Sequence, residues 1–386
     1  MLRFDLVIVG AGLAGAGLAA ALRQSRLRIA LIESRPPTPA PDGWDSRIYA
    51  VSPASAAFLE EIGAWRHLDP ARLTPVYDMA IRGDGDGQLD FSAYDSGVEQ
   101  LAWIVESGLI QRELWESVRR QANVTLFCPA QPQRLDIRED AVSLGLTSGE
   151  TLEARLVVGA DGADSWVRTQ AGLPADTLLY GEMGVVANFE CERPHHNTAY
   201  QWFRADGVLA YLPLPGNRIS VVWSTPEAHA RTLLALDEAA FCDGVAQAGH
   251  RQLGALRQIT PPAAFPLRLM RVPRSVAPRL ALIGDAAHAI HPLSGHGINL
   301  GFLDARELAR VLLELPDFRD CGDERVLRSY ERARAEEVAL LQWTTHGLQR
   351  LFRPQHAALS ALRNLGLNLT ESLPVLRNML VRYALG

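Results

Sequence analysis

A glycine-rich turn near the start of the chain constrains the fold more than any other feature. The segment DLVIVGAGLAGAGLAAAL begins with a short apolar stretch, places Gly10, Gly12 and Gly15 in a Gly-x-Gly-x-x-Gly spacing, and continues in small residues. Glycines at this spacing allow a tight turn between a buried strand and a helix, and let backbone N–H groups approach a phosphate. The pattern therefore predicts a strand over residues 5–9, a turn, and a helix whose N-terminus faces an anion.

A second strand is predicted over residues 28–33, RIALIE, with Glu33 at its carboxyl end. A carboxylate in this position accepts hydrogen bonds from the ribose hydroxyls of a bound dinucleotide. Glycines at this spacing are often fortuitous, but strand, helix and acid occur here together, so a dinucleotide site is the better interpretation. The turn itself does not distinguish NAD from FAD.

Two later segments have the same form. In RLVVGADGADSWVR, Asp161 follows a strand predicted over residues 155–158, and in LALIGDAAHAIHPLSGHGINLG, Gly284 and Asp285 follow another. An acid beside glycines at the end of a strand can accept from ligand hydroxyls, while the next helix start donates to phosphate. The alternative for Asp161 is a helix N-cap, a common position for aspartate.

Composition excludes several other chemistries. All 38 cationic residues are arginine, which rules out Schiff-base chemistry and a P-loop lysine. The four cysteines are far apart without a Cys-x-x-Cys pair, so no disulfide framework or zinc ribbon is indicated, and a reducing cytoplasm fits best. His288, His291 and His296 invite a metal interpretation, but no carboxylate or cysteine completes a set. His195 and His196 are expected to lie in a solvated loop. We expect neither a metal nor a nucleic acid as a partner.

Four further segments carry a family resemblance: WDSRIYAVSPAS near residue 44, VESGLIQREL near 105, GVLAYLPLPGNRISVVWS near 207 and HPLSGHGINLGFLDARELA near 291. With the three strand-end motifs, they resemble the group A flavoprotein monooxygenases of the p-hydroxybenzoate hydroxylase fold, and more narrowly the ubiquinone-biosynthesis hydroxylases. The resemblance spans essentially the whole chain. It implies an α/β fold, with a Rossmann-like βαβ FAD-binding domain, an inserted antiparallel-sheet substrate domain and a C-terminal helical segment.

The resemblance also implies how the chain is divided. A discontinuous FAD-binding domain is expected over residues 1–73, 97–175 and 270–330, the substrate sheet over 74–96 and 176–269, and the C-terminal helices over 331–386. Residues 76–94 and 180–224 alternate apolar and polar side chains like antiparallel strands, and RGDGDGQ at 82–88 reads as a hairpin turn. Aromatic residues in these strands could line a substrate site, but we favour plain core packing for them; they are Trp202, Phe203, Tyr211 and Trp223.

Carried over by position, the resemblance implies a set of cofactor-binding residues. The glycine turn and Glu33 hold the ADP half of FAD, Asp161 serves FAD and the nicotinamide donor, and Asp285 binds the ribityl hydroxyls and pyrophosphate. Arg35 and Arg47 lie near the adenosine and pyrophosphate. The family arginine that opens the helix below the flavin is matched by Arg112, and Ala130 offers a backbone contact to adenine. The full set is Gly10, Gly12, Leu13, Ala14, Gly15, Glu33, Arg35, Arg47, Arg112, Ala130, Asp161, Gly284, Asp285, Pro292, Gly295, Gly297, Ile298 and Asn299.

The segment from Pro292 to Asn299 is expected to surround the flavin ring. Pro292 packs near the isoalloxazine, and the helix opened by Gly295 to Asn299 points at its pyrimidine edge, where backbone donors stabilise the reduced flavin anion. His296 stands where the family usually has glutamine. Because imidazole can become charged, the oxygen reactivity of the flavin is expected to depend on pH. Pro292 and His296 are the flavin-adjacent candidates; no catalytic acid or nucleophile is assigned.

The implied activity is hydroxylation of the aromatic ring of a polyprenyl phenol or quinol in ubiquinone biosynthesis. NAD(P)H reduces the flavin, O2 adds at its C4a position, and the hydroperoxide transfers oxygen to the ring. Two alternatives stay open. The chain could be a flavin monooxygenase of a soluble phenol, or a flavin-stabilised scaffold subunit of a quinone-biosynthesis assembly.

The end of the chain suggests contact with a membrane surface. Residues 343–386 contain five arginines and a single acid, Glu371, whereas the whole chain has a net charge of −6. Leucines at three- and four-residue intervals, from Leu359 to Leu380, predict apolar helix faces. A helical pair packed on the core would show the same periodicity. The charge asymmetry favours a cytoplasmic protein that contacts the inner face of the membrane peripherally.

Overall fold

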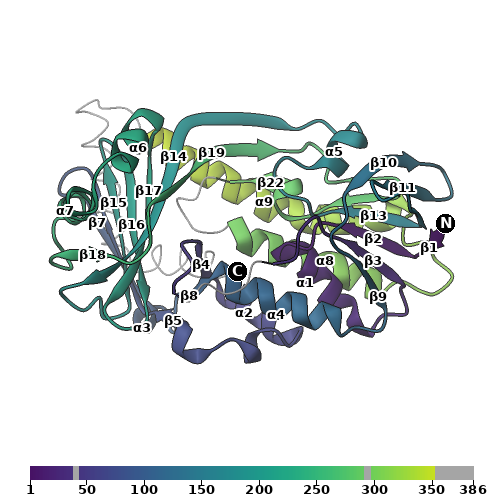
Figure 1. The fold of residues 1–386 in the computed structure, drawn as a ribbon, viewed down its shortest axis with the longest axis horizontal. Coiled ribbons are helices and arrows are strands. Elements are labelled where there is room, and N and C mark those ends of the chain that lie inside the picture. Colours follow the sequence, from purple (N-terminus) through teal and green to yellow (C-terminus); the bar gives the residue numbers. More distant parts are fainter. Residues whose placement is uncertain (38–42, 291–296, 353–386) are drawn as a thin grey trace.

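The computed structural model describes residues 1–37, 43–290 and 297–352. Strands of this part of the chain form four sheets. The two largest lie at opposite ends of the molecule, and the long strands β14 (Asp176–Cys191) and β19 (Ala263–Arg271) run between the two ends (Figure 1).

The six-stranded sheet is built from the strands of the glycine-rich motifs. Its order is β20, β21, β13, β2, β3, β9, and all neighbours are parallel except β20 and β21. Its strands are short and fully buried where they carry the motifs, as expected for a parallel sheet covered on both faces. The strands are β2 (Leu6–Val9), β3 (Ile29–Ile32), β9 (Val124–Phe127), β13 (Leu156–Gly159), β20 (Val276–Ala277) and β21 (Leu280–Leu282).

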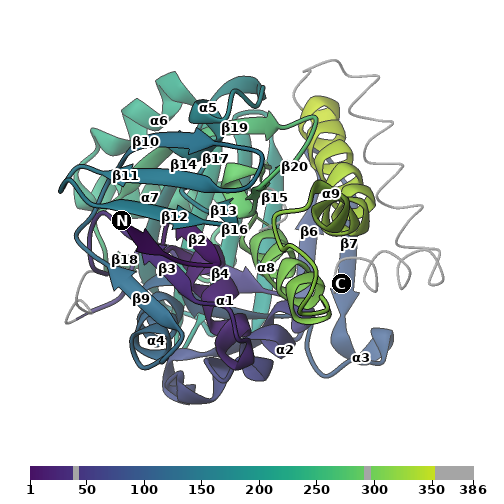
Figure 2. The ribbon, with the colours of Figure 1, turned by 90° about the vertical axis from the view of Figure 1, so that its right-hand side faces the viewer.

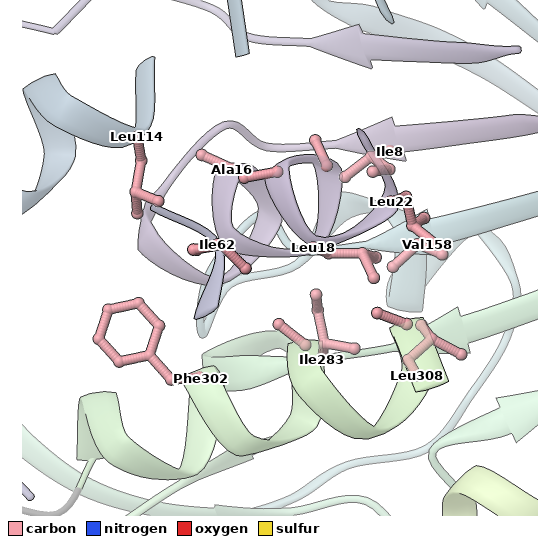
Figure 3. Close-up of a cluster of buried hydrophobic side chains, with 14 of the residues drawn as sticks. Ile8, Ala16, Leu18, Leu22, Ile62, Leu114, Val158, Ile283, Phe302 and Leu308 are labelled. Atoms are coloured by element: carbon pink, nitrogen blue, oxygen red, sulfur yellow. The ribbon is translucent and has the colours of Figure 1, made fainter. Parts of the chain in front are cut away.

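Helix α1 (Leu13–Ala21) packs between this sheet and α8 (Gly297–Leu313), as Figure 3 shows. Its small residues let it lie close to the strands, and Leu18 of α1 is fully buried in one cluster with Ile8 of β2 and Phe302 of α8. Burial of each large apolar side chain stabilises the fold by about 1.5–3 kcal/mol. This cluster fixes the start of α1 against the ends of the central strands.

The second large sheet has the order β22, β19, β14, β17, β16, β15, β6, β7, with β18 pairing to β14. Neighbouring strands are antiparallel, as predicted, except that β6 runs parallel to β15 because it arrives from a distant part of the chain. The hairpin predicted at 82–88 is present, since the N–H of Gly83 donates to the carbonyl of Gly87 between β6 and β7. The remaining strands are β6 (Asp78–Arg82), β7 (Gln88–Ser92), β15 (Thr198–Arg204), β16 (Gly207–Leu214), β17 (Arg218–Pro226), β18 (Leu256–Gln258) and β22 (His288–Ala289).

The two faces of this sheet differ because side chains alternate along each strand. One face carries Trp202, Tyr211 and Trp223, which form a core with α6 (Glu227–Leu234) and α7 (Glu238–Ala248). The hydroxyl of Tyr211 donates to the carbonyl of Val245 in α7 at 2.7 Å. The predicted core role of these three aromatic residues is confirmed. Phe203 is also buried, at 4% exposure.

Two smaller sheets and several helices complete the described chain. The three-stranded sheet consists of β4 (Ile48–Val51), β5 (Thr74–Val76) and β8 (Ala102–Glu106), and the four-stranded sheet of β1 (Leu2–Arg3), β10 (Pro132–Ile137), β11 (Val142–Leu146) and β12 (Thr151–Ala154). The other helices are α2 (Pro53–Glu61), α3 (Ala93–Ser96), α4 (Ser107–Arg119), α5 (Trp166–Gln170) and α9 (Glu324–Phe352). Figure 2 shows α9 beside α8.

The observed architecture confirms the predicted α/β class. The division of the chain into two domains and C-terminal helices stays a proposal about folding units. Within the described ranges, no helix combines the length and apolar character needed to cross a bilayer. Residues 353–386, on which the predicted apolar helix faces fall, lie outside the described residues.

Two glycines in the large sheet region predict opposite effects of one substitution. Gly207 has φ +130°, and an added Cβ would lie 1.9 Å from the carbonyl oxygen of Ser224. We expect Gly207→Ala to lower the free energy of unfolding by about 1–3 kcal/mol. Gly244 lies inside α7 with no atom within 4 Å of such a Cβ, so Gly244→Ala should raise stability by up to about 1 kcal/mol. Urea unfolding followed by circular dichroism measures both; equal effects would contradict the assigned backbone geometry.

Candidate functional site

The motif residues meet at one edge of the six-stranded sheet. Strands β2, β3, β13 and β21 are parallel, so their carboxyl ends lie side by side. The residues that follow these ends are Gly10, Glu33, Asp161 and Gly284, so motifs separated by up to about 270 positions in the sequence share one site. This is the edge at which ligands bind in parallel α/β sheets.

A cavity of about 1190 Å³ opens at this edge. It exceeds the roughly 300–1,000 Å³ of ordinary small-molecule pockets, so it has room for more than one ligand. Predicted residues that line it are Gly10, Gly12, Leu13, Ala14, Glu33, Arg47, Ala130, Asp161, Gly284, Asp285, Gly297, Ile298 and Asn299.

Other predicted residues lie elsewhere. Gly15 packs against the strand end, since a Cβ there would lie 2.0 Å from the carbonyl oxygen of Gly10. Arg35 is exposed, and Arg112 is half-buried within α4, which begins at Ser107; neither is among the lining residues. The same helix instead offers Gln111, whose amide donates to the carbonyl of Ala11 at 2.5 Å.

Pro292, Gly295 and His296 lie outside the described residues, so the structure does not test the flavin-adjacent candidates. The predicted helix corresponds to α8, whose first described residue is Gly297.

The glycine turn leaves open space where a phosphate would lie. Gly10 has φ +100°, and a Cβ there would meet the backbone of Ala160 at 2.4 Å, so only glycine fits between the two strand ends. At Gly12, at Gly162 and at Gly297, by contrast, an added Cβ would meet no atom within 4 Å. Three motifs therefore present uncovered backbone to the same cavity. A pyrophosphate cradle requires this arrangement.

Glu33 closes the end of β3 and lines the cavity. One carboxylate oxygen accepts from the N–H of Ala11 at 2.8 Å, and the other accepts from the hydroxyl of Ser34 and the N–H of Arg35. These bonds fix the carboxylate beside the glycine turn. The N–H of Ala130 donates to the carbonyl of Glu33, so an adenine contact at Ala130 would have to use its carbonyl.

Asp161 organises the loop that follows β13. Its carboxylate accepts from the hydroxyl of Ser165 at 2.5 Å and from the N–H of Val167 at 3.0 Å, so it helps to cap α5. Arg168, which is buried, donates to the carbonyls of Ala163 and Ala286 at 2.8 Å each. This arginine ties the Asp161 loop to the Asp285 turn. The sequence analysis assigned no role to Arg168.

Asp285 is exposed to the cavity, although protein atoms surround it. This desolvation raises the pKa of its carboxyl, while the nearby charges of His288, Arg268 and Arg47 oppose the rise. Several cationic groups thus face one carboxylate at the point where hydroxyls of a ligand would be accepted.

The turn that carries Asp285 rests on a buried carboxylate that the sequence analysis missed. Asp304 of α8 is 0% exposed and accepts from three elements: the N–H of Gly284 at 2.9 Å, Nε2 of His288 at 2.6 Å and Nε of Arg334 at 2.8 Å. Burial opposes ionisation of both partners, but their pairing prevails, lowering the pKa of Asp304 and raising that of His288. His288 is therefore a structural partner of Asp304.

Asn299 of α8 joins this helix to the β4 segment at the edge of the cavity. The side chain of Asn299 donates to the carbonyl of Ala50 and accepts from the N–H of Ser52, both at 2.9 Å. The first turn of α8 is thereby fixed to β4, with Gly297, Ile298 and Asn299 lining the cavity. The predicted contribution of Asn299 is thus through its backbone, because the side chain is already bonded.

The opposite wall of the cavity comes from the nine-stranded sheet. The face that does not pack on α6 and α7 is lined by small or apolar side chains with a few polar ones. We call these residues the sheet wall: Val186, Ala199, Gln201, Val208, Ala210, Leu212, Ser220, Val222 and Ser224. One cavity therefore has a phosphate- and hydroxyl-binding side and an apolar side.

Two histidine hypotheses can be compared with the structure. His195 was predicted to lie in a solvated loop with His196, but it is 4% exposed, and Nε2 contacts the carbonyls of Leu214 and Gly216. That prediction was wrong for His195, because the ring bridges two turns of the sheet. Among the described residues, no cluster of His, Cys, Asp and Glu has a metal-binding arrangement.

The family model of an FAD binding domain matches residues 3–342. The chain belongs to this FAD-binding family. FAD is therefore the cofactor of this chain, as predicted. The open backbone at three glycines and the size of the cavity fit this group.

Comparisons with individual proteins confirm the narrower resemblance. Ubiquinone hydroxylase UbiL of Rhodospirillum rubrum is 34% identical, over 99% of this chain and 89% of the relative. The 3-demethoxyubiquinol 3-hydroxylase of Escherichia coli is 33% identical, over 99% of this chain and 98% of the relative. The crystal structure of p-nitrophenol 4-monooxygenase PnpA from Pseudomonas putida shares the fold, with a TM-score of 0.80 at 20% identity, and covers 100% of this chain and 99% of that chain.

The Asp304 cluster predicts a large loss of stability from a small change. Asp304→Asn removes the charge that His288 and Arg334 share, and should lower the free energy of unfolding by about 3–5 kcal/mol. Glu314→Gln is the control, because its pair with Arg310 is exposed and worth about 0.3–0.5 kcal/mol. Chemical unfolding measures both variants, and similar losses would show that the cluster is not a stabilising unit.

The raised pKa of His288 predicts a specific pH dependence. The folded chain holds this proton more tightly than the unfolded chain, so the contribution to stability is complete below the ordinary value of 6.5. It disappears as the pH rises through the higher folded pKa. The free energy of unfolding of the wild type should therefore decline above about pH 6.5. In His288→Gln that decline should be smaller; parallel pH profiles of the two proteins would rule out the assignment.

Proposed function

We propose that this protein is an FAD-dependent monooxygenase that hydroxylates the aromatic ring of a polyprenyl phenol or quinol in ubiquinone biosynthesis, with NAD(P)H and O2 as co-substrates. The observation that carries the proposal is that two different walls face each other in one cavity. Its strand-end side has the open backbone and acids that suit FAD, and its sheet wall suits an apolar substrate. The names of the two ubiquinone-pathway relatives support this substrate class.

The proposed FAD contacts follow the cavity from the glycine turn to α8. Gly10 and Gly12 with Glu33 would hold the ADP half, and Asp161 and Asp285 would face the pyrophosphate and ribityl chain. Residues 297–299 would meet the flavin ring at the start of α8. Gly15 would contribute by packing. Arg35 and Arg112, which are outside the lining, remain weaker candidates than Arg47.

Bound FAD supplies the redox chemistry that activates O2 with electrons from NAD(P)H. The residues of the chain bind, orient and exclude water. The N-terminal end of α8 would place the positive end of its helix dipole where negative charge develops on reduction. The sheet wall presents Ala199, Ala210 and Val222 to the space beside it, and such apolar surface keeps water away from a ring held there.

The cofactor site is tested by Asp285→Ala. Loss of charge-assisted hydrogen bonds worth about 1.5–3 kcal/mol each should raise the Kd for FAD roughly tenfold or more. Asp317→Ala is the control, because Asp317 is exposed and forms a surface ion pair with Arg26. Flavin fluorescence titration of the apoprotein gives both values, and unchanged affinity in Asp285→Ala would contradict the assignment.

The reaction itself is tested in cells and in solution. A strain without this protein should accumulate a prenylated ring precursor that lacks one hydroxyl, detectable by mass spectrometry of lipid extracts. The purified holoenzyme should oxidise NAD(P)H faster when that precursor is added. Normal quinone with accumulation of a soluble phenol would favour the first alternative substrate class. Loss of quinone without substrate-dependent NAD(P)H oxidation would favour a scaffold role.

We also propose a cytoplasmic location with peripheral contact to the inner face of the membrane, and a place in a quinone-biosynthesis complex. Four large apolar side chains are exposed on β14 and α9: Leu178, Leu179, Leu340 and Trp343. The two elements are joined here, because the hydroxyl of Tyr180 lies 3.1 Å from Nδ1 of His346. The arginine-rich sequence 343–386 begins at the same place.

The membrane proposal predicts binding that depends on lipid charge. The holoenzyme should sediment with vesicles containing phosphatidylglycerol and not with phosphatidylcholine alone, since each arginine near an anionic surface contributes about 1 kcal/mol. Salt at 0.5 M, with a screening length of roughly 4 Å, should release much of it. Trp343→Ser should weaken the binding. Phe318→Ser should not, because Phe318 is exposed on the loop between α8 and α9. Equal binding to both vesicle types would exclude the mechanism.

A further inference from the structure

The sheet wall contains one long polar side chain among small and apolar neighbours. Gln201 of β15 is 6% exposed and lines the cavity. Its register partners on the neighbouring strands are Ala210 of β16 and Ile81 of β6, neither of which has a polar side-chain group. Among the described residues, the side chain of Gln201 has no hydrogen-bond partner.

Ser220, a second polar residue of the sheet wall, differs from Gln201 in having a polar side chain opposite it. Ser220 of β17 also lines the cavity, but its hydroxyl oxygen is sealed from solvent. It lies opposite Asn188 of β14 in the register, and Oδ1 of Asn188 is likewise sealed and without a partner in the described structure. A side-chain rotation within this pair can satisfy both atoms, so Ser220 does not require a ligand. Gln201 has no such neighbour.

The amide opens onto the cavity, and a ligand that displaced water from it without offering a hydrogen bond would bind less tightly. The cofactor motifs come from the six-stranded sheet, α1 and α8, and not from β15. The group that meets Gln201 therefore belongs to the second ligand of the cavity. Apart from the short hydroxyls of Ser220 and Ser224, the rest of the sheet wall is apolar, so one long amide can fix the orientation of a molecule whose only polar group is on its ring.

We propose that Gln201 is a specificity-determining residue that hydrogen-bonds the ring oxygen of the aromatic substrate. The inference rests on the proposed function and deepens it. Its amide carbonyl oxygen accepts from the phenolic O–H, whereas an ether at the same position has no proton to donate. The apolar remainder of the sheet wall contacts the ring and the start of the prenyl chain. Gln201 thus selects a free phenol over its O-alkylated form.

The test compares two ligands that differ by one hydrogen-bond donor, 2-geranylphenol and its methyl ether. Each is titrated into oxidised holoenzyme without NAD(P)H, and the change in flavin absorbance gives the Kd. The wild type should prefer the phenol about tenfold, the factor that corresponds to one hydrogen bond. Gln201→Met, which keeps the length and shape of the side chain, should bind the ether as before and lose the preference. Gln252→Leu is the control, because Gln252 is exposed and outside the cavity lining.

Each outcome decides a different point. A preference that persists in Gln201→Met, with both ligands bound, overturns the role of Gln201 and leaves the proposed function intact. Equal weakening of phenol and ether in that variant shows a structural role and also overturns the inference. Failure of the wild type to bind either compound counts against the prenylphenol substrate class itself. Ether binding in Gln201→Met also reports that the variant is folded.

Discussion

Parallel pairing of the strands in the six-stranded sheet is the constraint on which the site depends. Because β2, β3, β13 and β21 point the same way, every motif that follows a strand reaches the same edge. Antiparallel pairing would send alternate motifs to opposite edges. The close contact between Gly10 and Ala160 shows how tightly this edge is packed, and any side chain at Gly10 would separate the two strands. Cofactor binding is therefore a consequence of strand direction.

In the nine-stranded sheet, the alternation of side chains along each strand gives the two faces different compositions. Odd and even positions along β14 to β17 have opposite environments, and the bulky aromatics occupy the face under α6 and α7. This leaves mostly alanine, valine and serine on the face toward the cavity, and the small size of these side chains creates the space. A shift of one residue in β15, β16 or β17 would turn Trp202, Tyr211 or Trp223 toward the cavity. The large cavity and the dense core are thus two results of the same register.

Local patterns predicted the strands, the glycine turns, the hairpin at 82–88 and the core role of Trp202 and Trp223. They did so because strand ends, turns and alternation are encoded by neighbouring residues. The interactions that sequence reasoning missed join distant segments. Asp304 reads as an ordinary polar residue of an amphipathic helix, and its buried state appears only when Gly284, His288 and Arg334 are brought to it.

The same limitation explains the residues that lie elsewhere than expected. Arg112 matches the family arginine of this helix in the sequence. In the structure it is Gln111, one residue earlier on α4, that contacts the glycine turn. A step of one residue turns a side chain by about 100° around a helix, and sequence alone does not fix that rotation. Gln201 gave no signal either, because a glutamine in an alternating strand usually faces water.

Helix α9 links the two ends of the molecule. At one point along it Arg334 is paired with Asp304 below the six-stranded sheet, and further on Gln342 donates to the carbonyl of Met270 in the nine-stranded sheet. With a rise of 1.5 Å per residue, these anchors are roughly 12 Å apart on a stiff rod. The helix is therefore a stiff connection between the two sheets, and a motion that separated them at these anchors would have to break the buried Arg334–Asp304 pair or the Gln342 hydrogen bond.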